Sequence, residues 1–144
     1  MKKISLIFLS LVALMFFFSC SKSENRTTPS IVGRWNFDSD RYKSTTLQGS
    51  TIVNSEDTTT YYAAGSYLEL RSDGTFSSLV DSTYDNGNYT VANNKLTIMT
   101  SNDTSIVDIL SLTDNLLQLH NIGSDVDTTI GYTYNWEFWI NLSR

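Results

Sequence analysis

The sequence predicts an all-β protein, and three observations on its 144 residues support this. After position 30, apolar side chains recur at every second residue, as expected for strands that bury one face. The segments that show this alternation are rich in Val, Ile, Thr, Tyr, Phe and Trp, which favour strands. Short runs of Asn, Asp, Gly and Ser separate the segments, and these residues are typical of tight turns.

The two ends of the predicted domain are its clearest strands. "IVGRWNFD" at 31–38 alternates an apolar face with a polar face, and its apolar face contains Gly33 and Trp35. "YTYNWEFWINL" at 132–142 does the same over a longer stretch, with one face formed by Tyr132, Tyr134, Trp136, Phe138, Ile140 and Leu142. This pattern predicts antiparallel strands with one buried face and one wet face.

Turn residues predict the first of three hairpins between these ends. In "YLELRSDGTFSS" a two-residue loop would place Phe76 opposite the charged Arg71. A three-residue loop, 72–74, with Gly74 in the left-handed conformation instead pairs Leu70 with Phe76. We expect the second register, because a slip of one residue turns the apolar side chains of a strand toward water.

The other two hairpins follow from short polar loops. The loop Asn93-Asn94 pairs Val91 with Leu96 and Tyr89 with Ile98, and Asn tolerates the positive φ that such a turn needs. The loop Asp114-Asn115 pairs two Leu residues with two others, Leu112 with Leu117 and Leu110 with Leu119. Each register places the paired apolar side chains on one face of its hairpin.

These segments add up to an antiparallel up-and-down eight-stranded β-barrel. Pairing the first strand with the last removes both exposed sheet edges. A two-sheet β-sandwich is the alternative. The predicted interior is bulky, and it includes Trp35, Phe37, Leu68, Leu70, Phe76, Tyr89, Val91, Leu96, Ile98, Leu110, Leu112, Leu117, Leu119, Tyr132, Tyr134, Trp136, Phe138 and Ile140.

The amino-terminal segment predicts export and lipidation. Two lysines precede an apolar stretch at 4–18, which is too short for a comfortable membrane span and has the layout of an export signal. The residues around Cys20, the chain's one cysteine, resemble a bacterial lipobox. We therefore expect a signal peptide at 1–19, a lipidated Cys20 with a polar tether at 20–30, and a barrel domain at 31–144. An ordinary secretory signal is the alternative.

The motifs "IVGRWNF", "DGTF", "NNKLTI" and "LTDNLLQL" together resemble the lipocalin-like domains of Bacteroidetes lipoproteins, over roughly 31–142. The resemblance implies a lipocalin-like barrel that is open at one end and takes small, mostly apolar ligands. It also implies that Gly33 and Trp35 form a structural plug at the closed end. The chain departs from typical secreted lipocalins, since its domain is shorter and its sequence predicts neither disulfides nor a flanking helix.

Candidate ligand contacts are Tyr89, Tyr132, Tyr134 and Trp136, because Tyr and Trp combine an apolar body with a polar tip. Plain packing is the alternative role for each, since an eight-stranded barrel is barely wider than its own side chains need. The segment 39–66 is long for a hairpin link. It predicts either a loop over the barrel mouth or further strand, for which "TTTYYAA" is suitable.

Other polar residues give weaker signals. Asp108 shares its alternation with Leu110 and is expected to face inward or to sit at a barrel rim. Asp125 and Asp127 are too few for a calcium loop. His120 has no second histidine or free thiol to complete a zinc site or a nucleophile pair. We therefore expect no enzyme, no metal and no cofactor.

The functional expectation is a lipid-anchored protein of the bacterial cell envelope that binds a small apolar or amphipathic molecule. It contacts the membrane through its anchor, at the outer membrane. The formal net charge of −5 and the lack of a basic cluster argue against nucleic acid as a partner. The alternative is a packed barrel without ligand that acts as a protein-interaction or structural module, with Val32 and Trp139 as contacts. An internal cavity would favour the first, and a solid interior with exposed apolar residues the second.

Overall fold

The computed structural model describes residues 29–144, which form a closed antiparallel barrel with one additional strand. Eight strands follow one another around the barrel, and the first pairs with the last, which excludes the sandwich. None of the described residues belongs to a helix long and apolar enough to cross a membrane. The strands are β1 (Gly33–Gln48), β2 (Thr51–Tyr61), β3 (Tyr67–Leu70), β4 (Thr75–Val80), β5 (Thr83–Ala92), β6 (Lys95–Met99), β7 (Thr104–Leu112), β8 (Leu116–Asp127) and β9 (Tyr132–Ser143).

The predicted hairpins are present, and the first two have the predicted registers. Leu70 pairs with Phe76, and Gly74 has a φ of 81°. The Asn93-Asn94 turn has positive φ at both residues, which matches the twist of the strands that it joins. The β4–β5 turn, formed by Asp81 and Ser82, also has positive φ at both residues and was not predicted.

The third hairpin departs from the prediction because β7 contains a bulge. Leu112 pairs with Leu117 as expected, but Leu119 pairs with Ile109 and not with Leu110. The register shift lies between Ile109 and Ser111, so the extra residue turns Leu110 outward, where it is 52% exposed. The expectation that Leu110 faces the interior is therefore wrong, and the alternation of β7 upstream of the bulge is inverted.

The same inversion explains Asp108. Its carboxylate accepts from the Lys95 ammonium across β6 and β7, and both side chains are about half exposed. Val107 packs against the core in its place. One pair further along the β5–β6 hairpin, Val91 lies opposite Leu96 and is 44% exposed, so the expectation that it faces the interior is wrong.

The barrel interior is one apolar cluster contributed by strands all around the wall. Its fully buried members include Trp35, Leu70, Leu96, Leu117, Leu119 and Leu142. Partly buried side chains fill in around them: Phe37, Ile98, Val107, Ile109, Leu112 and Ile140. Residues of all barrel strands therefore converge on a packed core, as expected for a narrow barrel.

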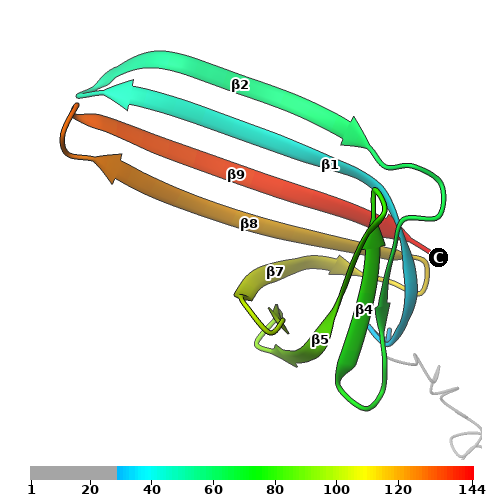
Figure 1. Ribbon diagram of the computed structural model, residues 1–144. Helices are drawn as coiled ribbons and strands as arrows, with labels where there is room; N and C mark the ends of the chain where they lie inside the picture. The colour runs from blue at the N-terminus through cyan, green and yellow to red at the C-terminus, as the bar shows by residue number, and fades with distance from the viewer. Residues whose placement is uncertain (1–28) are drawn as a thin grey trace, which may run out of the picture.

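A long four-stranded sheet projects from one end of this barrel (Figure 1). It consists of residues 39–48 of β1, all of β2, 121–127 of β8 and 132–139 of β9, in the order β2-β1-β9-β8. We call it the extension. The segment 39–66, for which the sequence left a mouth-covering loop and further strand open, is mostly strand.

The extension arises because two barrel strands continue past their neighbours. β1 pairs with β3 through Asn36, and β2 then takes the place of β3 along the same edge from Ser39. β8 pairs with β7 as far as His120, and its pairing with β9 continues to Asp127. Within the described residues, the outer edges of β2 and of distal β8 have no strand partner.

Candidate functional site

The four predicted ligand contacts separate into two places. Tyr89 is 8% exposed in the barrel core, and its hydroxyl donates to the Arg71 carbonyl at 2.7 Å. Burial raises its pKa. Tyr132, Tyr134 and Trp136 all lie on the extension, so the structure does not bring them together with Tyr89 in the barrel.

Trp35 lies near the start of β1, at the end of the barrel away from the extension. Its ring is fully buried, and its indole N–H donates to the Ile31 carbonyl at 2.8 Å. The Arg144 guanidinium stacks 4.0 Å from the ring centroid and donates to the carbonyls of Ser30 and Val32. Gly33 has a φ of 140°, and a Cβ there would lie 2.6 Å from the Arg144 guanidinium. These contacts tie the two chain ends of the barrel together.

At the other end, where the extension begins, Tyr62 packs against Phe37 with ring centroids 5.0 Å apart. The Tyr62 hydroxyl donates to the Asp40 carboxylate at 2.7 Å. Burial, followed by this hydrogen bond, raises the pKa of Tyr62 strongly. Tyr62 therefore stays protonated and connects the end of β2 to β1 at the root of the extension.

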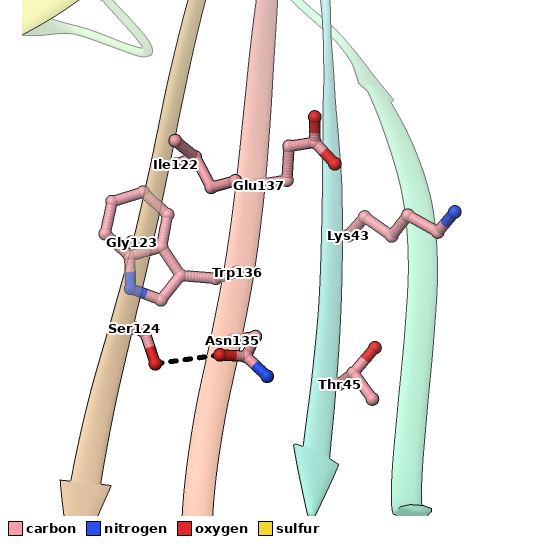
Figure 2. A pocket seen from close by; sticks show the side chains of 8 residues that line it. All are labelled: Lys43, Thr45, Ile122, Gly123, Ser124, Asn135, Trp136 and Glu137. Carbon is pink, nitrogen blue, oxygen red and sulfur yellow. Dashed lines mark hydrogen bonds between the residues drawn. The ribbon is translucent and has the colours of Figure 1, made fainter.

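The extension carries an open hollow of about 580 Å³ (Figure 2). Strands β1, β9 and β8 provide its lining, which consists of Lys43, Thr45, Ile122, Gly123, Ser124, Asn135, Trp136 and Glu137. The Ser124 hydroxyl donates to the Asn135 side-chain oxygen at 2.8 Å and connects two of these strands. A second hollow of about 450 Å³ lies on the barrel wall over β4 and β5, and it includes Arg71, Tyr84 and Asn86.

The registers assign most of the lining of the first hollow to one face of the extension. Lys43 lies opposite Glu137 across β1 and β9, and Ser124 lies opposite Asn135 across β9 and β8. Side chains alternate along each strand, so these groups share a face, which we call the polar face. It presents an ammonium, a carboxylate, an amide and hydroxyls beside the exposed Ile122.

A network of charged and aromatic side chains lies on the polar face between the hollow and the barrel. His120 Nε2 is 2.9 Å from the Glu137 carboxylate, and the His120 ring is tilted against Trp139. The Arg41 guanidinium lies 5.4 Å from the Trp139 ring centroid and forms two hydrogen bonds to Asp57. The hydrogen bond from Arg41 is the main reason why the pKa of Asp57 is lower than usual. Trp139 is thus partly covered by neighbours.

The opposite face of the extension, which we call the aromatic face, continues the inward-facing rows of the barrel. It includes Tyr42, Tyr132, Tyr134, Trp136 and Phe138. Trp136 lies directly opposite Gly123, and a Cβ added to Gly123 would be 2.1 Å from indole Cζ2. The indole therefore crosses to β8 and lies on the backbone of Gly123, which only a residue without a side chain permits.

The remaining acidic candidates lie near the turn between β8 and β9. Asp125 and Asp127 accept hydrogen bonds from nearby backbone N–H groups, which is the usual role of Asp near a turn. Within residues 29–144, no group of three or more His, Cys, Asp or Glu side chains is placed to hold a metal ion. Cys20 and the signal peptide 1–19 lie outside the described residues, as does most of the tether.

Sequence reasoning missed the hollow. The alternation of β9 was clear, but it does not show where the barrel wall ends, and Lys43, Thr45 and Ser124 have no motif. One available signal was length, because β1 and β9 alternate over more residues than a small barrel needs. Comparisons of the chain with protein-family models, with curated proteins and with solved structures found no match.

Proposed function

We propose that this chain is a lipid-anchored protein of the bacterial cell envelope whose barrel is a packed scaffold and whose extension binds a small amphipathic molecule. The hollow at Lys43, Ser124 and Glu137 is the observation that carries this proposal. Its volume is within the range of small-molecule sites, and it combines apolar surface with a few polar groups.

The packed barrel core favours a ligand site on the extension over a site inside the barrel. Trp35, Leu96 and Leu117 are fully buried and belong to one contiguous cluster with the other core side chains. A ligand in the barrel would have to displace such side chains, and a close-packed core resists this. The lining of the hollow, in contrast, includes strongly exposed groups such as Ile122, at 64%.

The anchor is the second part of the proposal. A diacylglycerol on the Cys20 thiol and a further acyl chain on its amine would hold the protein to the membrane effectively permanently. The ten residues after Cys20 would then separate the domain from the lipid by on the order of 16–19 Å. This distance leaves the extension free to meet ligands.

Lipidation is tested in a bacterial host by metabolic labelling with a fatty-acid analogue and by detergent partition. We expect the wild-type chain to be labelled and to enter the detergent phase, whereas Cys20→Ser is unlabelled. An unlabelled wild-type chain would contradict the anchor and would leave the hollow unaffected.

Ligand binding is tested by native mass spectrometry of the protein purified from its own host. We expect a co-purifying small molecule on the wild type, lost in Ser124→Trp, which fills the hollow from an exposed position. The matched control is Asp125→Asn, one residue along the same strand but on the other face, which should retain the molecule. Retention in Ser124→Trp would contradict the proposed site.

A second function, protein interaction through the extension, is favoured by a specific observation. Exposed apolar side chains gather on the extension and its turns, namely Tyr42, Ile52, Val53, Tyr61, Ile122, Val126, Ile130 and Tyr134. Apolar groups gathered in this way mark interaction surfaces.

A further inference from the structure

The aromatic face of the extension has no partner in the part of the chain that the structure describes. Tyr132, Tyr134, Trp136 and Phe138 occupy alternate positions of β9, and Tyr42 pairs with Phe138 across β1. Tyr42 is 37% exposed and Tyr134 38%. The extension is a single layer (Figure 1), so an aromatic row on one of its faces is a surface suited to another molecule.

Trp136 is the centre of this surface. Its indole lies over Gly123, where Cζ2, Cε2 and Nε1 would be 2.1, 2.3 and 2.8 Å from an added Cβ, and the side chain is only partly buried. Figure 2 shows the ring crossing from β9 to β8 at Gly123. A flat indole with an accessible face is the best side-chain acceptor for a cation–π contact.

The charges on this face have one sign. Asp125 lies opposite Tyr134 on β8, and Glu56 lies on the same face of β2, opposite Ser44. Both carboxylates are exposed. The described strands of the extension carry two basic residues, Arg41 and Lys43, and their alternation places both on the polar face. The aromatic face is therefore complementary to a cation.

The molecule already pairs guanidinium groups with aromatic rings elsewhere. Three such pairs are present among the described residues: Arg34–Tyr67, Arg144–Trp35 and Arg41–Trp139. In Arg34–Tyr67 the guanidinium carbon lies 3.8 Å from the ring centroid. On the aromatic face the rings and the carboxylates are present, and none of the described strands places an arginine on that face.

We propose that the aromatic face binds an extended, arginine-rich segment of a partner protein. Aromatic side chains at alternate positions of β9 are spaced by about 6.5–7 Å, which is the spacing of alternate residues in an extended peptide. Arginines at every second position of the segment stack on Trp136 and Tyr134, and their guanidinium groups pair with Asp125 and Glu56. This interaction goes beyond the small-molecule function, because Tyr134, Asp125 and Glu56 do not line the hollow, although Trp136 does.

The test uses the purified full-length protein in detergent and a synthetic peptide that alternates Arg and Thr. Affinity is measured by calorimetry and by Trp fluorescence. The double variant Glu56→Gln/Asp125→Asn is expected to weaken binding about tenfold, or ~1.4 kcal/mol. Both positions are exposed, so this variant should fold, and circular dichroism checks that it does. Glu137→Gln, on the polar face, is the matched control and should bind like the wild type.

Stacking is tested separately from charge with a peptide that alternates Lys and Thr. It should bind several-fold more weakly, because an ammonium lacks the planar face of a guanidinium. Trp136→Leu should reduce the Arg peptide to the level of the Lys peptide. Equal affinity for both peptides, or equal binding by the wild type and the double carboxylate variant, would overturn the proposal.

Two further outcomes would also overturn it. An equal loss of affinity in Glu137→Gln would place the peptide elsewhere, and wild-type dimers that Tyr134→Ser dissociates would assign the face to a second copy of this chain. Failure of this proposal is distinguishable from failure of the small-molecule function, since Ser124→Trp changes the hollow and leaves the aromatic face in place.

Discussion

The same strands behave differently in the barrel and in the extension. Between Ile140 and Leu142, β9 contributes to the packed core, whereas a few residues upstream Tyr134 is 38% exposed. The alternation does not change between these positions. What changes is whether other strands of the barrel lie opposite this face of β9. An alternating apolar pattern therefore predicts which face of a strand is apolar, but it does not predict what packs against that face.

The largest expected contrast is between two tryptophans. Trp35→Ala removes a fully buried ring together with its hydrogen bond to Ile31, and should lower the free energy of unfolding by about 3–5 kcal/mol. Trp136→Ala removes a partly buried ring from the extension and should cost on the order of 1 kcal/mol. Chemical denaturation of both variants measures the difference. Equal losses would mean that the extension is as tightly integrated as the core.

A smaller contrast tests the bulge in β7. Ile109 packs against the core and Leu110 points to solvent, although the sequence alternation suggested the reverse. Ile109→Ala should therefore destabilise the protein by about 2 kcal/mol, since Ile109 is only partly buried. Leu110→Ala should stay within about 0.5 kcal/mol of the wild type. A reversed order would show that the strand pairs without the bulge.

Tyr62, at the root of the extension, should make the free energy of unfolding depend on pH. The folded state raises the pKa of Tyr62 above the unfolded value of about 10, so its contribution to stability is complete below that pH. The contribution is lost as pH rises above about 10 and the unfolded state ionises first. Denaturation between neutral and alkaline pH should show this loss in the wild type. In Tyr62→Phe this part of the alkaline loss of stability should be absent. A variant with the same pH profile of stability as the wild type would contradict the Tyr62–Asp40 contact.

The smallest expected effect concerns Arg41 and Asp57, which connect β1 and β2 on the extension. The pKa of the Asp57 carboxyl should be below that of a free aspartate, and Arg41→Gln should return it toward the ordinary value. Both groups are exposed, so little change in global stability should accompany this shift. An NMR titration of the Asp57 carboxyl measures this pKa. An unchanged pKa in Arg41→Gln would contradict the Arg41–Asp57 contact.

Much of the barrel was predictable from sequence because its turns are local. Gly74 and the Asn93-Asn94 pair identify loops whose geometry fixes the register of the strands on either side. The bulge at Leu110 was not predictable, because a single inserted residue leaves no mark in an apolar stretch. The extension was not predictable for a different reason. Whether Trp136 faces another wall depends on where β3 and β7 end, and these are distant in sequence.

The candidate site was predicted only in part. Tyr132, Tyr134 and Trp136 of β9 were predicted as ligand contacts inside the barrel, whereas the structure places them on the extension. The hollow depends on side chains from β1, β8 and β9 that come together only through long-range pairing, as Lys43 and Glu137 do. Residue types such as Thr45 and Ser124 carry no signal before that pairing is known.

The central claim is that the barrel is a filled scaffold and that the extension carries the ligand. Methyl-resolved NMR tests it directly when the protein is titrated with a small-molecule extract of its host's envelope. We predict that the methyl signals of Ile122 shift while those of Leu70, Leu96 and Leu119 do not. Shifts confined to these three core leucines would place the ligand inside the barrel and contradict the account.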